Sequence, residues 1–118
     1  MTAYIIYFNQ QWVPDYPVED FDDIARDSHA LVDRMQEAGI VRFAGGLEET
    51  PPRAHADATS GELVIADGPY SRPDEWVGGF TIIEVDTERE ARYWTGAIAE
   101  ACRWPQELRA FTDGWTKG

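Results

Sequence analysis

Two histidines and 22 acidic residues are the side chains of this sequence best suited to acid–base chemistry. His29 precedes Asp33 by four positions, in a stretch where apolar residues recur at helical spacing. In a helix the two side chains lie on neighbouring turns and can hydrogen-bond, which raises the basicity of the imidazole. This spacing favours His29 as a general acid or base at the edge of a cleft. The alternative is a half-exposed surface histidine paired with an acid.

Asp67 is the second candidate catalytic residue. It closes the apolar run at residues 63–66 and opens a long polar loop. A carboxylate at the head of such a loop can act as a base. Alternatively, it accepts hydrogen bonds from the backbone amides of the Gly68-Pro69 turn, a place that Asp favours for backbone reasons alone. If Asp67 and His29 act on one substrate, they must share one cleft and lie within roughly 10 Å of each other.

Four further side chains are candidates for binding a substrate. Tyr70, Arg72 and Trp76 lie in the loop that Asp67 opens. The guanidinium suits a substrate carboxylate, and the two aromatic rings can form an apolar wall. The alternative is a loop packed down by its own aromatic residues. Arg42 stands among apolar residues and faces a cleft or a barrel interior, or else forms an interface salt bridge.

We expect neither a metal nor an organic cofactor. His55, Asp57 and Glu62 fall in one short segment, but neither a cysteine cluster nor an H-E-x-x-H pattern accompanies them. Cys102, the one cysteine, has no evident histidine partner and is interpreted as a packing residue. Nucleophile-elbow, phosphate-loop and dinucleotide motifs do not occur in the sequence.

The elements that must position these residues follow from apolar spacing and turn signals. A helix is predicted from about Glu19 to the residue before Gly39. A second helix begins after Thr87, which has Glu90 three residues on as a capping box, and ends before Pro105. The first helix presents one apolar face, formed by Phe21, Ile24, Ala25, Ser28, Leu31, Val32 and Met35. Strands are predicted at residues 4–8, 40–47, 54–59, 62–67, 79–85 and 107–111, with Ser60-Gly61 as the turn of a hairpin.

This order predicts a single domain over residues 1–118 of the α+β class, a ferredoxin-like βαβ(ββ)βαβ sandwich. Two helices can cover only one face of its sheet. Alternate residues of a strand point to opposite faces, and both faces are apolar in residues 4–8 and 79–85. We therefore expect the second face to pack on a second copy, which gives a homodimer in the form of a dimeric α+β barrel. The alternative is that loops cover this face.

Charge and composition exclude several classes of partner. The chain has 10 basic and 22 acidic residues, a net charge of −12, so it repels nucleic acids and anionic membrane surfaces. The N-terminus lacks the basic segment and apolar run of a signal peptide, and no stretch approaches the roughly 20 apolar residues of a membrane span. One cysteine cannot form an internal disulfide. We expect a cytoplasmic protein.

Two motifs stand out: Asp67-Gly68-Pro69-Tyr70 after an apolar run, and the Gly-Gly-aromatic sequence within Val77–Val85. In these residues the chain resembles the YCII-related, or DGPF-domain, family: the first motif is similar to the DGPF signature, with Tyr in place of Phe, and the second is similar to the family's Gly-Gly-aromatic strand. The opening strand, Tyr4–Tyr7, and the glycine pair Gly45-Gly46 also resemble it. The ordered set covers nearly the whole chain.

The resemblance implies a ferredoxin-like dimeric barrel, a cytoplasmic bacterial protein and no organic cofactor. In the YCII branch a helix histidine, matched here by His29, is paired with an Asp nearer the C-terminus. That Asp has no match, since residues 101–105 are Ala-Cys-Arg-Trp-Pro. Relatives also occur fused to sigma-factor-like proteins. The expectation is thus a cofactor-free enzyme of isomerase, lyase or hydrolase type, with a non-catalytic module that binds a small molecule or a regulatory protein as the alternative and a purely structural dimer as a third.

Overall fold

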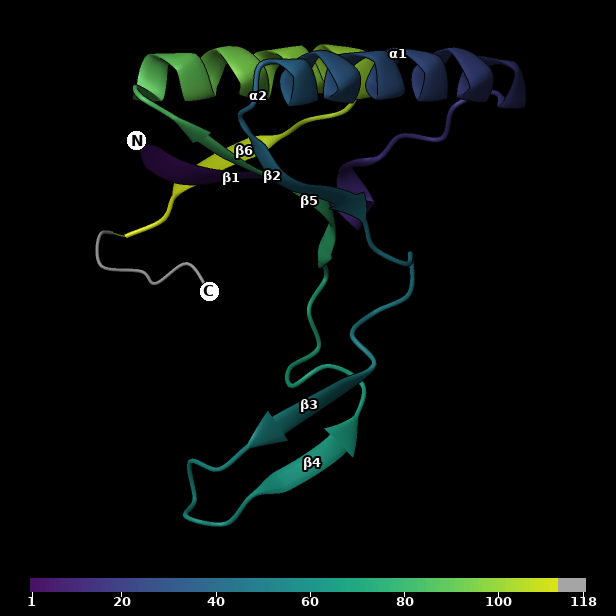
Figure 1. Ribbon diagram of the computed structural model, residues 1–118. Helices are drawn as coiled ribbons and strands as arrows, with labels where there is room; N and C mark the ends of the chain where they lie inside the picture. The colour runs from purple at the N-terminus through teal and green to yellow at the C-terminus, as the bar shows by residue number, and fades with distance from the viewer. Residues whose placement is uncertain (113–118) are drawn as a thin grey trace.

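A computed structural model, which describes residues 1–112, shows an α+β fold in which two helices lie on one side of a four-stranded sheet (Figure 1). The sheet has the order β2-β5-β1-β6, and all its neighbouring strands are antiparallel. This is the strand order of the ferredoxin-like arrangement that the sequence predicts. In chain order the elements are β1 (Thr2–Asn9), the 3-10 helix η1 (Gln10–Trp12), α1 (Val18–Glu37), β2 (Val41–Gly46), β3 (Ala54–Asp57), β4 (Val64–Asp67), β5 (Val77–Val85), α2 (Glu88–Cys102) and β6 (Glu107–Ala110).

Local sequence signals explain where both helices begin and where α1 ends. The Thr87 hydroxyl accepts a hydrogen bond from the Glu90 amide at 3.2 Å, which confirms the predicted capping box at the start of α2. Glu19 and Asp20 place negative charge in the first turn of α1. Beyond its last turn, Gly39 has φ of +73°, a left-handed conformation that glycine adopts at little cost and that ends the helix.

The core lies between the helices and one face of the sheet. In β1, Tyr4 and Ile6 point toward the helices, and in β5 their register partners Ile83 and Thr81 share that face. Leu31 and Met35 of α1 pack on this face, as do the buried Ala91 and Ile98 of α2. Among the residues predicted for the apolar face of α1, Phe21 is instead 52 % exposed, because it lies in the first turn of the helix.

The other face of the sheet carries no helix (Figure 1). Ile5 and Tyr7 of β1 alternate with the core residues, and their register partners in β5 are Ile82 and Phe80. Phe43 of β2 stacks on Phe80 with ring centroids 5.4 Å apart. The predicted apolar character of both faces is thus confirmed, and we call these five side chains the open face.

Strands β3 and β4 pair only with each other and form the predicted hairpin, though each is shorter than expected. This hairpin, which we call the arm, projects from the side of the sheet that is opposite the helices (Figure 1). Two of its side chains, Val64 and Ile65, are large, apolar and 51 % and 70 % exposed. The chain is extended as a result: its radius of gyration is 16.6 Å, whereas a compact domain of this length has roughly 13.5 Å.

Neither helix in residues 1–112 has the length and apolar character needed to cross a membrane.

Candidate ligand-binding site

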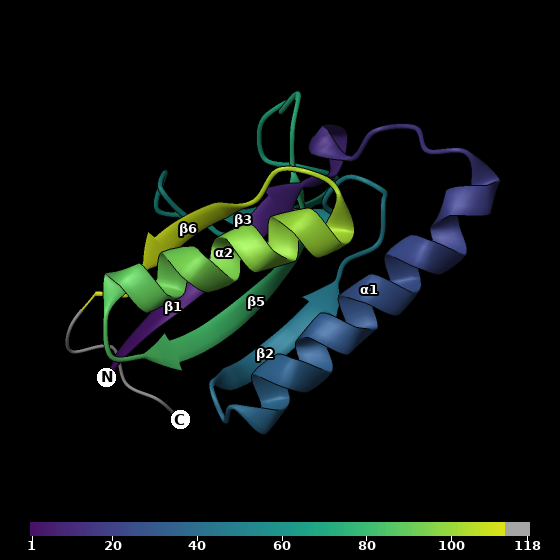
Figure 2. The ribbon, with the colours of Figure 1, turned by 90° about the horizontal axis from the view of Figure 1, so that it is seen from above.

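A pocket of about 520 Å³ opens between α1, the end of α2 and the helix-side face of the sheet. Seen from above, α1 and α2 diverge over β2 and β5 (Figure 2). The floor of the pocket is rich in small residues: Ala44, Gly45 and Gly46 of β2 line it, together with Thr81 of β5, the register partner of Ala44. With so little side chain on the sheet, α1 leaves space beneath it.

Phe8 explains why the floor is glycine-rich. Its ring lies over Gly79, its register partner, and a Cβ at Gly79 would lie 2.9 Å from that ring and 3.1 Å from the carbonyl oxygen of Gly45. Real Cβ atoms do not approach other atoms so closely. The glycines of the Gly-Gly-aromatic strand therefore make room for an aromatic side chain that itself lines the pocket.

His29 lies on the wall that α1 contributes, next to Ser28 and one turn before Asp33, and all three line the pocket. The imidazole is exposed, and in the described part of the chain it has no hydrogen-bond partner. The predicted hydrogen bond to Asp33 is therefore not formed. The i, i+4 spacing puts both residues on one side of α1, but both side chains remain exposed at the pocket mouth.

At the opposite wall, Cys102 ends α2 and places its Sγ 3.5 Å from the Ser28 Oγ. Burial raises the pKa of the Cys102 thiol, and the hydrogen bond with Ser28 opposes that rise more weakly. Cys102 is thus a neutral thiol at physiological pH, in agreement with its interpretation as a packing residue.

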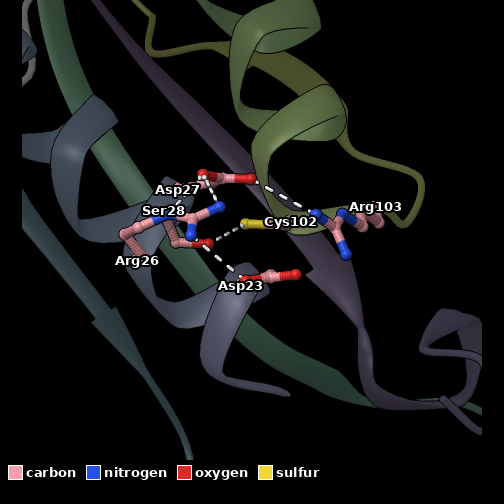
Figure 3. Close-up of polar contacts among 6 residues, drawn as sticks. All are labelled: Asp23, Arg26, Asp27, Ser28, Cys102 and Arg103. Carbon is pink, nitrogen blue, oxygen red and sulfur yellow. Dashed lines mark hydrogen bonds and ion pairs between the residues drawn. The ribbon is translucent and has the colours of Figure 1, made fainter. Parts of the chain in front are cut away.

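The chain turns sharply after α2. Arg103 has φ of +67°, which is unusual for a residue with a Cβ, and its carbonyl oxygen accepts a hydrogen bond from the Tyr16 hydroxyl. Its guanidinium lies 3.3 Å from Asp27 of α1. Figure 3 shows this ion pair beside Cys102, together with the contacts of Arg26 to Asp23 and Asp27. The Arg103–Asp27 ion pair and the Ser28–Cys102 contact join the end of α2 to α1, whereas the contacts of Arg26 lie within α1.

Two hydrogen-bond donors belong to the residues that follow this turn. Trp104 and Gln106 line it, and the Trp104 ring packs on Phe8 with centroids 5.2 Å apart. The Trp104 Nε1 and the Gln106 Nε2 are buried and, among residues 1–112, have no hydrogen-bond partner. Buried donors without partners are rare in folded proteins, so this end of the pocket lacks acceptors.

Asp67 is not part of this pocket. It is the last residue of β4 in the arm, where its side chain is exposed and makes no hydrogen bond within the described chain. The turn after it instead uses Gly68, whose φ of +81° suits glycine and whose carbonyl oxygen lies 3.0 Å from the His55 Nδ1. Within one chain, His29 and Asp67 therefore belong to different parts of the fold.

The loop residues predicted to bind a substrate lie near the arm as well. Tyr70 is 70 % exposed and meets His55 edge-on, with ring centroids 5.7 Å apart. Arg72 is exposed. Trp76 holds the loop to the rest of the chain, because its indole donates to the Glu49 carbonyl oxygen at 3.1 Å. None of the three lines the pocket with His29.

Arg42 forms a salt bridge within the chain. Its Nε lies 2.9 Å from the Glu84 carboxylate, and its Nη1 donates to the Gly39 carbonyl oxygen at 3.0 Å. Glu84 is 6 % exposed and lies on the helix-free face of the sheet, since it alternates with the core residue Ile83. Arg42 therefore neutralises a buried carboxylate on that face.

No group of three or more His, Cys, Asp and Glu side chains in residues 1–112 is arranged to hold a metal ion. Asp57, one of the three residues that suggested a metal site in the hairpin, forms hydrogen bonds within the hairpin instead. Asp57 accepts hydrogen bonds from the amide and hydroxyl of Thr59, at 2.8 and 2.7 Å. The first of these bonds is the largest cause of a lowered pKa of the Asp57 carboxyl.

Comparison with known proteins adds no family. No family model matches this chain, and a search of curated proteins finds no match. The resemblance to the YCII and DGPF family therefore remains a prediction carried by its short motifs.

Sequence reasoning missed the end of the pocket formed by Ser28, Cys102, Trp104 and Gln106. One signal was present: Pro105 stops α2, so the residues around it must turn back toward the sheet. The bulky Trp104 in that turn is suited to packing against the strand edge.

Proposed function

We propose that this protein binds a small, mainly apolar molecule in the pocket between its helices and its sheet. The observation that carries this proposal is the pocket itself, whose volume of about 520 Å³ falls within the roughly 300–1,000 Å³ usual for small-molecule sites. Leu31, Val32 and Ile98 contribute to a mainly apolar lining, with fewer polar side chains among them. That distribution suits a molecule held by burial and oriented by few hydrogen bonds.

A fluorescent probe tests this proposal. N-phenyl-1-naphthylamine is neutral and apolar, and its emission rises when it leaves water. We expect saturable binding at one site per chain. Ala44→Leu adds bulk to the pocket floor and should weaken binding at least about tenfold, since it removes volume from the site. Ala30→Leu, the same change on α1 outside the pocket lining, is the control and should leave the affinity unchanged. Equal affinity in wild type and Ala44→Leu would contradict the proposal.

Acid–base catalysis is the second candidate function, and the position of His29 favours it. The imidazole stands at the pocket mouth and can reach a bound molecule with a labile proton. Against it, no carboxylate orients the ring within the described chain, and Asp67 lies in the arm. A His29→Gln variant that binds a ligand normally but no longer converts it, followed by mass spectrometry of the ligand, would decide for an enzyme. Conversion at the wild-type rate would decide against this role.

The partner we propose is a second copy of the chain, which packs on the open face and contacts the arm. The chain exposes 8353 Å², whereas a compact monomer of 13.4 kDa exposes roughly 6,500 Å². The excess is larger than the roughly 800 Å² per partner that a standard protein interface buries. The arm supports this partner as well, since a two-stranded hairpin is marginally stable alone. Because it projects on the open-face side, any copy that covers this face must meet it.

A further inference from the structure

We infer that the ligand of the pocket is a neutral molecule with a carbonyl-type hydrogen-bond acceptor, which is received by the Trp104 Nε1 and the Gln106 Nε2. This inference rests on the proposed binding function and names its ligand class. Both atoms belong to residues that line one end of the pocket, both are buried, and neither has a partner within residues 1–112.

Because both groups are hydrogen-bond donors, the ligand must supply the acceptor. An indole nitrogen only donates, and the amide nitrogen of glutamine only donates. A buried donor without an acceptor is destabilising, so an acceptor oxygen on a bound ligand would relieve this deficit. A carbonyl oxygen has two lone pairs and can accept from both donors at once.

The charges around the pocket select a neutral acceptor over an anionic one. Among residues 1–112, neither an arginine nor a lysine lines the pocket, whereas Asp33 and His29, both at the mouth, do. The whole chain carries −12. A carboxylate on the ligand at the Trp104 end of the pocket would thus be buried without an arginine or lysine from residues 1–112 to compensate its loss of hydration. Ketones, lactones and amides avoid this cost.

The two donor residues follow an unusual backbone conformation at this end of the pocket. Arg103 takes a left-handed conformation, which is unfavourable for a residue with a Cβ. The Tyr16 hydroxyl and Asp27 hold it there. After this turn, Trp104 and Gln106 both line the pocket, and the Trp104 ring packs on Phe8.

Because both donors are covered by neighbouring side chains, the ligand must displace that cover as it binds. We therefore expect binding to change the fluorescence of Trp104. A bound water molecule is the rival occupant, because a buried water makes about three hydrogen bonds of this kind. A water would give the donors partners but would make affinity independent of the acceptor on the ligand.

Three probes with one ring system separate these cases: 2-acetylnaphthalene, 2-ethylnaphthalene and 2-naphthoate. Equilibrium dialysis against the full-length protein gives their affinities. We expect the ketone to bind about tenfold tighter than the ethyl compound, as one or two hydrogen bonds provide, and the carboxylate to bind weakest. Gln106→Met keeps the shape but removes the donor, and it should reduce the advantage of the ketone severalfold. Trp104→Phe should do the same and abolish the fluorescence change. Gln36→Met, an equal change on the opposite wall, is the control and should preserve the advantage.

The outcomes are distinct. Equal affinity of the ketone and the ethyl compound, with both sensitive to Ala44→Leu, overturns the acceptor inference and leaves the binding function standing. Tightest binding of the carboxylate overturns the choice of a neutral ligand. Failure of all three probes to bind overturns the proposed function together with this inference. A ketone advantage that persists in both Gln106→Met and Trp104→Phe assigns the acceptor to other groups and overturns the inference alone.

Discussion

Ser28 and Cys102 join the two helices across the pocket: the Oγ of one and the Sγ of the other lie 3.5 Å apart, although 74 positions separate them in sequence. The contact closes the pocket at the end of α2, next to the strained turn at Arg103. The reactivity of the Cys102 thiol therefore indicates whether this end of the pocket is closed.

The pH dependence of Cys102 alkylation is the first prediction. Burial raises the pKa of this thiol above its ordinary value of 9.0, so at every pH below that value the folded chain holds less thiolate than the unfolded chain. Since thiolate is the reactive form, iodoacetamide should modify the folded protein at pH 7.5 at least about tenfold more slowly than the protein in urea. The rate in the folded state should still be rising at pH 9. Equal rates in the two states at pH 7.5 would show that the thiol is neither buried nor shifted.

Arg103 provides a second prediction, because its φ of +67° favours glycine. Arg103→Gly should be more stable than Arg103→Ala by about 1 kcal/mol in the free energy of unfolding, measured by urea denaturation. Both variants lose the ion pair to Asp27, a partly exposed contact worth little, so the difference between them isolates the backbone term. If Arg103→Ala equals or exceeds Arg103→Gly in stability, the left-handed turn does not exist in solution.

The packing of Phe8 on Gly79 gives a third prediction. Gly79→Ala should destabilise the fold by about 1–3 kcal/mol, because the added methyl group meets the Phe8 ring and the Gly45 carbonyl oxygen, and the backbone atom cannot move freely. Gly96 of α2 is the matched control. A Cβ there has nothing within 4 Å, and alanine is the better helix former, so Gly96→Ala should stabilise by about 0.5–1 kcal/mol. Thermal and urea unfolding measure both, and two changes of the same sign would contradict the contact.

The sequence predicts most of this framework for identifiable reasons. The capping box at Thr87 and the glycine after α1 are local signals, and local signals predict where helices begin and end. Strand alternation in residues 4–8 and 79–85 likewise predicts which face of the sheet each side chain occupies.

The site is harder to predict because it depends on long-range placement. Periodicity identifies the side of α1 that carries His29, but it cannot tell that Asp67 lies in an arm remote from that helix. Nor does any local rule predict that the Trp104 Nε1 and the Gln106 Nε2 are buried, since they follow a left-handed residue whose carbonyl oxygen is bound by Tyr16, far away in sequence. Tertiary contacts of this kind have no short-range sequence signature.

A fourth prediction concerns the turn at the tip of the arm. The backbone amide of Thr59, and then its hydroxyl, lower the pKa of the Asp57 carboxyl below its ordinary value of 3.8. A pKa depressed in the folded state means that the contribution of Asp57 to the turn is complete above that ordinary value and is lost as the pH falls through the lowered one. An NMR titration should find the Asp57 midpoint below 3.8. Thr59→Val removes one of the two bonds and should move the midpoint part of the way back. A midpoint unchanged by Thr59→Val would rule out the hydroxyl contact.

The last prediction tests the arm and the open face as a contact between copies. Light scattering at micromolar concentration should give twice the chain mass of 13.4 kDa. Ile65→Lys places a charge on the arm where an isoleucine is 70 % exposed, and Phe43→Lys does so on the open face, where the phenylalanine is 53 % exposed. In a symmetric dimer each change occurs twice, so each variant should weaken association at least about tenfold. Tyr93→Lys is the matched control. Tyr93 is also a large exposed side chain, at 59 %, but it lies on α2, on the far side of the sheet, and its replacement should leave the dimer intact. A stable monomer of the wild-type chain would overturn the proposed partner. Dissociation by Tyr93→Lys alone would move the interface to the helices.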